Sequence, residues 1–231
     1  MILNIICPLA IWISLGTFTQ EADVFLKKYV QDGKVDYQAL ASQPQQLEAL
    51  YAQLGKVSLE GTSTESRKAF YVNAYNLLTI YQIIQHYPVS SPMDINGFFD
   101  EIKHQVAGET FTLNELEKGR LFKQYFDPRL HFALVCAAES CPALASFAYQ
   151  ADQLDQQLDK ITQQTLNDPA FIRLQLGKKE VAISKIFEWY KEDFLDTSSS
   201  LLDYINRYRE KPIPADYSVR FYEYNWQLNQ P

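Results

Sequence analysis

Residues 130–144 concentrate side chains that could take part in chemistry within an otherwise apolar stretch. The five are His131, Cys136, Glu139, Ser140 and Cys141. Cys141 is followed by a proline, which suits the first turn of a helix, and a helix N-terminus stabilises a thiolate. One hypothesis is therefore that Cys141 is a thiol nucleophile.

A nucleophilic thiol needs a base and groups that position that base. His131 is the candidate base for Cys141. Asn73 and Asn76 are three positions apart, so they share one face of a predicted helix and could orient the imidazole or donate to an oxyanion. These four residues predict a thiol-dependent hydrolase or acyltransferase. A structural role is the alternative for the asparagines, because an unpaired buried amide costs about 1–3 kcal/mol.

The cysteines have a structural alternative as well. Only Cys136 and Cys141 remain once an N-terminal leader containing Cys7 is removed, and an even pair in an oxidising compartment usually forms a disulfide. A metal site built from His131, Cys136, Glu139 and Cys141 is a weaker hypothesis, because their spacing matches no standard zinc pattern. We therefore expect neither a metal nor a cofactor.

The first 20 residues predict export. They carry no charged side chain, and the apolar run over 2–15 is too short to span a bilayer comfortably. This pattern indicates a signal peptide over 1–20, with cleavage after Gly16 as one option, and a single mature domain over 21–231. The protein would then be periplasmic or secreted. A retained N-terminal membrane anchor and a buried N-terminal helix are the alternatives, and no later segment is expected to cross a membrane.

Charge and aromatic content bear on the partner. The net charge is −7, without a basic run, so nucleic acid is not an expected partner. Tyr and Phe are frequent, at 15 and 14 residues. Trp189, Tyr190, Trp226 and several tyrosines could line a groove, although aromatic residues more often fill a core. The rival hypothesis is a monomeric, non-catalytic module that binds a small molecule, peptide or glycan and carries a structural Cys136–Cys141 disulfide.

Helical patterns dominate the chain. The most definite helix covers 64–86, where the core section is apolar nearly all round, with Thr62 or Ser63 as its cap. In the helix over 184–194, Glu188, Glu192 and Asp193 are typical of a solvated face. The remaining predicted helices cover 21–31, 40–54, 112–122 (opened by a capping box of Thr112 and Glu115), the segment after Pro142, 152–166 and 199–208.

Strand patterns are short by comparison. Hairpins are predicted over 102–112 and 171–183, a buried strand over 130–135, and an edge strand within the aromatic tail 219–228. A chain of 231 residues that is 47% hydrophobic can form one substantial core. We expect a helix-dominated α+β single domain with a small, mostly antiparallel sheet.

Several blocks, taken in order, resemble the uncharacterised family DUF547. They are 70–76 (FYVNAYN), 131–134 (HFAL), 140–144 (SCPAL), 184–194 (SKIFEWYKEDF) and 224–229 (YNWQLN). Asp36 and Tyr37, after Gly33-Lys-Val, also resemble the start of the bacterial members. The resemblance covers about residues 22 to 229 and implies kinship rather than a particular reaction, because the family has no known function.

The chain departs from the family pattern at Lys118, and its Cys141 occupies a position that varies within the family. Bacterial relatives often have a Glu-His pair where this chain has Glu117 and Lys118, so any role of that histidine is absent here. Plant relatives often carry Ser in place of Cys141. The resemblance thus implies a disulfide particular to exported bacterial members rather than a thiol common to the family.

Overall fold

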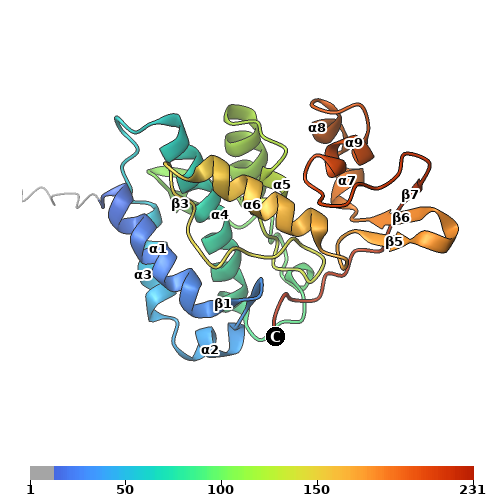
Figure 1. Cartoon of the computed structure of the whole chain (residues 1–231). Coiled ribbons are helices and arrows are strands. Elements are labelled where there is room, and N and C mark those ends of the chain that lie inside the picture. The colour runs from blue at the N-terminus through green and yellow to red at the C-terminus, as the bar shows by residue number, and fades with distance from the viewer. Residues whose placement is uncertain (1–12) are drawn as a thin grey trace, which may run out of the picture.

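The computed structural model describes residues 13–231, and Figure 1 shows their arrangement. The helices are α1 (Leu15–Tyr29), α2 (Tyr37–Ser42), α3 (Gln45–Leu54), α4 (Thr64–His86), η1 (Pro92–Asp94), η2 (Glu115–Phe122), α5 (Leu130–Ala133), α6 (Leu154–Asn167), η3 (Leu176–Lys178), α7 (Ile186–Trp189), α8 (Lys191–Leu195) and α9 (Leu201–Asn206). The strands are β1 (Val30–Gln31), β2 (Lys34–Val35), β3 (His104–Val106), β4 (Glu109–Phe111), β5 (Arg173–Gln175), β6 (Glu180–Ile183) and β7 (Ser218–Phe221). The predicted helix-dominated α+β class is confirmed.

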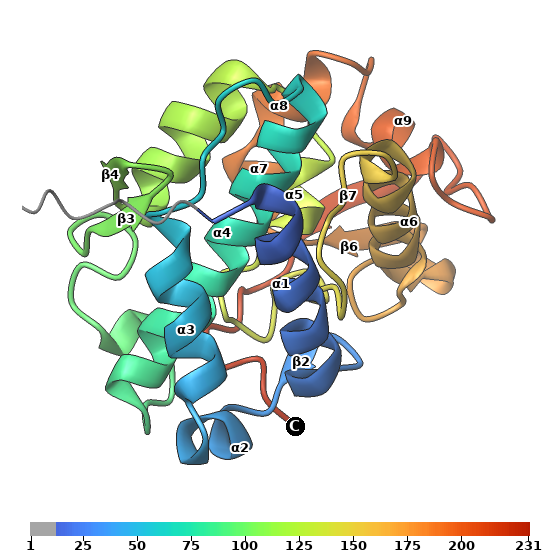
Figure 2. The ribbon, with the colours of Figure 1, turned by 90° about the vertical axis from the view of Figure 1, so that its left-hand side faces the viewer.

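Helix α4 is the centre of the fold, as its apolar pattern predicts. Its bounds match the predicted 64–86, and the Ser63 hydroxyl caps it by accepting from the Ser66 amide at 3.1 Å. Helices α1 and α3 lie beside it (Figure 2), and Phe18 of α1 meets Phe70 of α4 edge to face. The polar residues of α4 that point inward therefore reach segments that surround it on several sides.

Helix α1 starts earlier than the sequence pattern suggests. Residues 1–12, most of the predicted leader, lie outside the described residues. The Ser14 side chain caps α1, and Phe18, inside the predicted leader, is fully buried. A cut after Gly16 would remove this cap and the first two residues of α1. Cleavage at this point stays a prediction. Across the described residues, we find no helix with the length and apolar character needed to cross a membrane.

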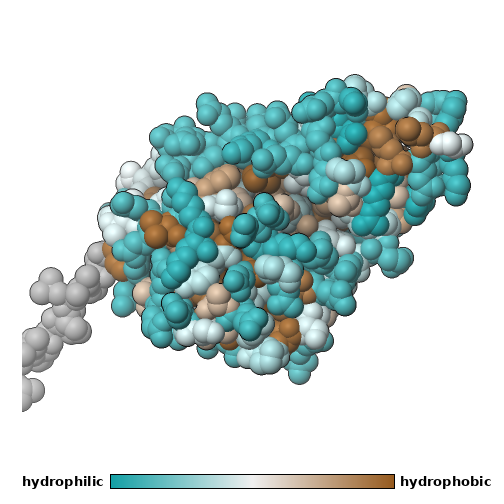
Figure 3. Space-filling view, turned by 60° about the horizontal axis from the view of Figure 1, so that its bottom comes forward, coloured by the Kyte–Doolittle hydropathy of each residue, from teal (hydrophilic) through white to brown (hydrophobic). Residues whose placement is uncertain are grey.

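The described strands form three small sheets. β1 pairs with β2 and β3 with β4, both antiparallel, which confirms the hairpin predicted over 102–112. β6 pairs antiparallel with β5 and parallel with β7. The predicted tail strand is confirmed only as far as Phe221. Apolar residues gather at the end of the molecule that holds β5, β6 and β7 (Figure 3). Leu174, Leu176 and Val219 are exposed there.

Two predictions around the cysteines are wrong. Residues 130–133 form the helix α5 instead of a strand, since a short apolar run fits either structure and here Asp127 caps the turn by accepting from the Arg129 amide. No helix starts at Pro142, and the next one begins at Leu154. The Leu144 amide donates to Gly33 instead, which holds the segment as an extended loop. Cys141 therefore has no helix dipole behind it.

The remaining boundaries shift by a few residues. The helix predicted over 40–54 is divided into α2 and α3 because Pro44 interrupts it. The capping box before η2 is confirmed, with the Glu115 amide donating to Thr112 Oγ1 at 3.1 Å and the Thr112 amide to Glu115 Oε2 at 2.8 Å. η2 itself is a π-helix, a wider turn that often occurs at functional sites.

Candidate functional site: an aromatic cavity beside a disulfide

A cavity of about 450 Å³ lies between α4, η2, the loop after α5, α7 and the C-terminal tail. These elements come from distant parts of the sequence. The residues that line it are Tyr75, Phe99, Asn114, Glu117, Lys118, His131, Leu134, Cys136, Cys141, Pro142, Ile186, Trp189, Tyr190, Tyr224 and Trp226. The cavity thus brings predicted site residues, His131 and Cys141, to one place.

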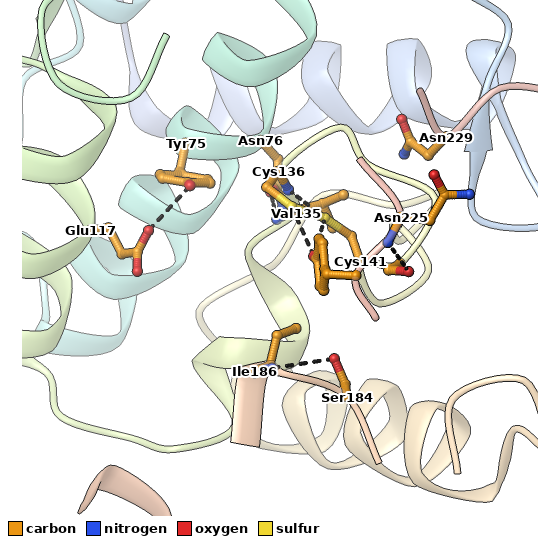
Figure 4. Close-up of a disulfide and its surroundings, with 12 residues drawn as sticks. Tyr75, Asn76, Glu117, Val135, Cys136, Cys141, Ser184, Ile186, Asn225 and Asn229 are labelled. Carbon is orange, nitrogen blue, oxygen red and sulfur yellow. Dashed lines mark hydrogen bonds between the residues drawn. A yellow bond between two sulfur atoms is a disulfide. The ribbon is translucent and has the colours of Figure 1, made fainter. Parts of the chain in front are cut away.

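Glu117 is the buried carboxylate of this cavity. It accepts hydrogen bonds from the Tyr75 hydroxyl at 3.2 Å and the Tyr190 hydroxyl at 2.9 Å, and Figure 4 shows Tyr75 facing it. Burial, and next the charge of Glu117, raise the pKa of both phenols, so both stay protonated and donate. Among the ion pairs formed within residues 13–231, none includes Glu117.

His131 is held by a carboxylate. Its Nε2 lies 2.8 Å from Asp193 Oδ2, and its ring lies between Phe122 and Tyr190, with ring centroids at 4.4 and 4.1 Å. The interpretation of Asp193 as part of a solvated helix face is therefore wrong. Because α7 and α8 are separate short helices, Asp193 turns toward His131 rather than following the face of one continuous helix.

Cys136 and Cys141 form a disulfide, with their Cα atoms 6.3 Å apart (Figure 4). This agrees with the structural alternative for the pair. The Tyr224 hydroxyl lies 3.2 Å from each sulfur, and the Cys136 amide donates to Cys141 Sγ at 3.1 Å. In this state Cys141 has no thiol to act as a nucleophile.

Asn73 and Asn76 each hold backbone from another segment. The Asn73 amide group donates to the Tyr149 carbonyl at 2.9 Å and accepts from its N–H at 2.8 Å. Asn76 donates to the Ala133 carbonyl at 2.9 Å and accepts from the Val135 N–H at 3.0 Å. Both side chains are buried, and neither is among the residues that line the cavity. The structural alternative accounts for these contacts.

The metal hypothesis has no support in the arrangement of its four residues. Both cysteines are bonded to each other, and Glu139 turns toward Lys34, 3.3 Å away. Within residues 13–231, no three or more His, Cys, Asp or Glu side chains are grouped so that they could hold a metal ion.

Aromatic rings form the outer wall of the cavity. The ring of Tyr224 lies 4.9 Å from that of Trp189 and 4.7 Å from that of Trp226, measured between centroids. Trp189 is 48% exposed, so it lies at the mouth. The sequence-based suggestion that Trp189, Tyr190 and Trp226 line a groove agrees with this geometry. The sequence did not single out Tyr75 or Tyr224, and it raised Glu117 only as a neighbour of a missing histidine.

Comparison with known proteins adds kinship over part of the chain. Residues 59–165 match the family described as "Protein of unknown function, DUF547". No curated protein and no solved structure matches the chain. The matched range includes Glu117, His131 and both cysteines, but not the aromatic wall from the C-terminal part.

Proposed function

We propose a function from the cavity, because the family that residues 59–165 match, DUF547, has no known function. The protein is a non-catalytic binding module that takes the cationic end of an organic ligand, such as a basic peptide side chain. The observation that carries this proposal is the buried Glu117 carboxylate, which faces an aromatic cavity and forms no ion pair within residues 13–231.

The charge of Glu117 is only partly compensated. A carboxylate offers about four lone-pair sites, and Tyr75 and Tyr190 occupy two with neutral donors. Charged groups interact more strongly where water is excluded, and burying a charge without an opposite charge is costly. An ammonium group that enters the cavity would supply both the missing charge and further donors.

The walls favour the same ligand. Trp and Tyr rings attract cations through their faces, and the cluster of Trp189, Tyr224 and Trp226 lies on the same cavity as Glu117. A volume of about 450 Å³ is in the range of small-ligand pockets. It suits a single side chain or a small amine, with the aliphatic stem against the rings.

A neutral glycan fits this cavity less well. A sugar ring can stack on Trp189 and Trp226, but it brings no charge to Glu117. Lys118, the basic residue of the same wall, is exposed, so its flexible stem can extend into solvent.

The direct test compares two ligands of similar shape and different charge. Calorimetric titration of the native protein with n-butylammonium and with 1-butanol, at one ionic strength, measures charge selectivity. We expect saturable binding of the amine, at least about tenfold tighter than that of the alcohol. Equal affinity for both, or tighter binding of a neutral disaccharide, would remove the cationic ligand from the proposal.

One observation favours a second function, the thiol-dependent hydrolase or acyltransferase. His131, oriented by Asp193 at 2.8 Å, lies on the same cavity as Cys141, so a base oriented by a carboxylate and a latent thiol share one space. We propose this activity only for the reduced protein. Titration of thiols before and after reduction tests it: a thiol at Cys141 that stays unreactive after reduction would exclude the nucleophile.

We also propose that the protein is exported. A disulfide persists in oxidising compartments and is rare in the cytosol, which supports the leader inferred from residues 1–20. Fractionation of cells that express the full chain tests this: the oxidised protein should be found outside the cytoplasm, and a cytoplasmic protein with free thiols at Cys136 and Cys141 would contradict it.

A further inference from the structure

The geometry points to an activity beyond binding: the Cys136–Cys141 disulfide is a directional site of thiol–disulfide exchange. An external thiolate attacks Cys136 Sγ, and Cys141 is the leaving group. Three observations carry this inference, namely the different exposure of the two cysteines, the backbone donor to Cys141 Sγ, and the cavity beside the bond.

The two cysteines differ in exposure. Both cysteines line the cavity, but Cys136 is half-buried while Cys141 is buried, with 9% of its surface exposed. Exchange requires the attacking thiolate to reach one sulfur. A small thiol, or the cysteine of a peptide, can enter the cavity and reaches Cys136 more readily.

The donors differ as well. The backbone amide of Cys136 donates to Cys141 Sγ at 3.1 Å. The Tyr224 hydroxyl lies 3.2 Å from both sulfurs, and burial raises the pKa of this phenol, so it remains a donor to whichever sulfur leaves; the backbone amide is the donor that favours Cys141. Hydrogen bonds to a thiolate lower its pKa, and a thiol of lower pKa leaves faster. Both groups are in place before the bond breaks.

The exchange step balances as follows. The external thiolate forms a new S–S bond with Cys136 Sγ, the Cys136–Cys141 bond breaks, and its electron pair goes to Cys141 Sγ as a thiolate. No net oxidation occurs in this step. A second external thiolate then attacks the mixed disulfide, which leaves the protein as a dithiol and the external thiol oxidised to its disulfide. His131 and Glu117 take no part, so the inference does not depend on the proposed cationic ligand.

Mapping the site of attack in the native protein tests the direction. The oxidised protein is treated with 2-mercaptoethanol while iodoacetamide is present to capture the released thiol, and peptides are analysed by mass spectrometry. We expect the mercaptoethanol adduct on Cys136 and the alkyl group on Cys141. The reverse assignment, an equal mixture of the two, or free thiols at both Cys136 and Cys141 in the isolated protein would overturn the inference.

A rate measurement tests the role of the donor. Tyr224→Phe keeps the ring against Trp189 and Trp226 but removes the hydroxyl, so exchange with 2-mercaptoethanol should slow roughly three- to tenfold. The matched control is Tyr222→Phe, two positions away with its ring under Arg173, and its rate should equal that of the native protein. No slowing in Tyr224→Phe would overturn the donor argument, and the mapping in the native chain still decides the direction if that variant does not fold.

Discussion

Tyr190 lies against His131, with ring centroids 4.1 Å apart, and its hydroxyl donates to Glu117 at 2.9 Å. One side chain from the segment between α7 and α8 thus joins the two polar groups of the cavity. These groups come from η2 and α5, so the cavity is assembled only when the segment around Tyr190 packs against these two helices.

Trp189 should contribute to ligand affinity but little to stability. Nearly half of its surface is exposed, and it forms the mouth of the cavity. Trp189→Leu should weaken binding of n-butylammonium by roughly fivefold, since the indole face is lost, while the unfolding free energy changes by less than about 0.5 kcal/mol. Calorimetry and urea unfolding measure the two effects. Unchanged affinity would place the ligand away from the aromatic wall.

Asn73 and Asn76 should both matter for stability, and only Asn76 for the cavity. Each holds an N–H and a carbonyl of another segment, so each change to Ala should cost about 2–4 kcal/mol. Asn76 holds the backbone of Ala133 and Val135, next to the loop after α5 that lines the cavity. Asn73 holds the backbone of Tyr149, which does not line it. Amine affinity of the folded fraction should therefore fall in Asn76→Ala and persist in Asn73→Ala. The opposite pattern would contradict this assignment.

Gly33 should be required for the position of the Cys141 loop. Its φ is +78°, and an added Cβ would lie 2.8 Å from the Ala143 Cα. Gly61 has a similar φ of +69° with open space around it, so Gly61→Ala is a matched control for the backbone strain alone, about 1 kcal/mol. Urea unfolding should show a clearly larger loss for Gly33→Ala. Equal losses would mean that the loop moves aside without cost.

His104 should make stability fall on acidification. Burial lowers its pKa from 6.5 to about 4, so between these values the unfolded chain binds the proton and the folded one does not. The contribution is therefore complete above pH 6.5 and is lost as the pH falls toward 4, by at most about 3 kcal/mol. His104→Phe should flatten this part of the stability profile, whereas the exposed His86→Gln should not. If His104→Phe kept the native dependence of stability on pH between 4 and 6.5, that would contradict this role of His104.

The sequence predicts the helices well and the site only in part. The helix over 64–86 has a cap, a stop and an apolar surface all round, so local signals suffice for α4. The run 130–135 is too short to distinguish strand from helix, and tertiary packing makes it α5. Glu117, Asp193 and Tyr224 are unremarkable in sequence because their roles arise from partners 42, 62 and 83 to 88 positions away. The disulfide could be predicted because Cys136 and Cys141 lie only five positions apart and form an even pair.

The central claim is that Glu117 recognises the charge of a ligand, and a thermodynamic cycle over residue charge and ligand charge measures this most directly. Calorimetry gives the affinities of n-butylammonium and 1-butanol for the native protein and for Glu117→Gln, with the exposed Glu188→Gln as a control for general charge. We predict that Glu117→Gln loses roughly tenfold in affinity for the amine and little for the alcohol, while Glu188→Gln behaves like the native protein. An equal change for both ligands in Glu117→Gln would contradict the account.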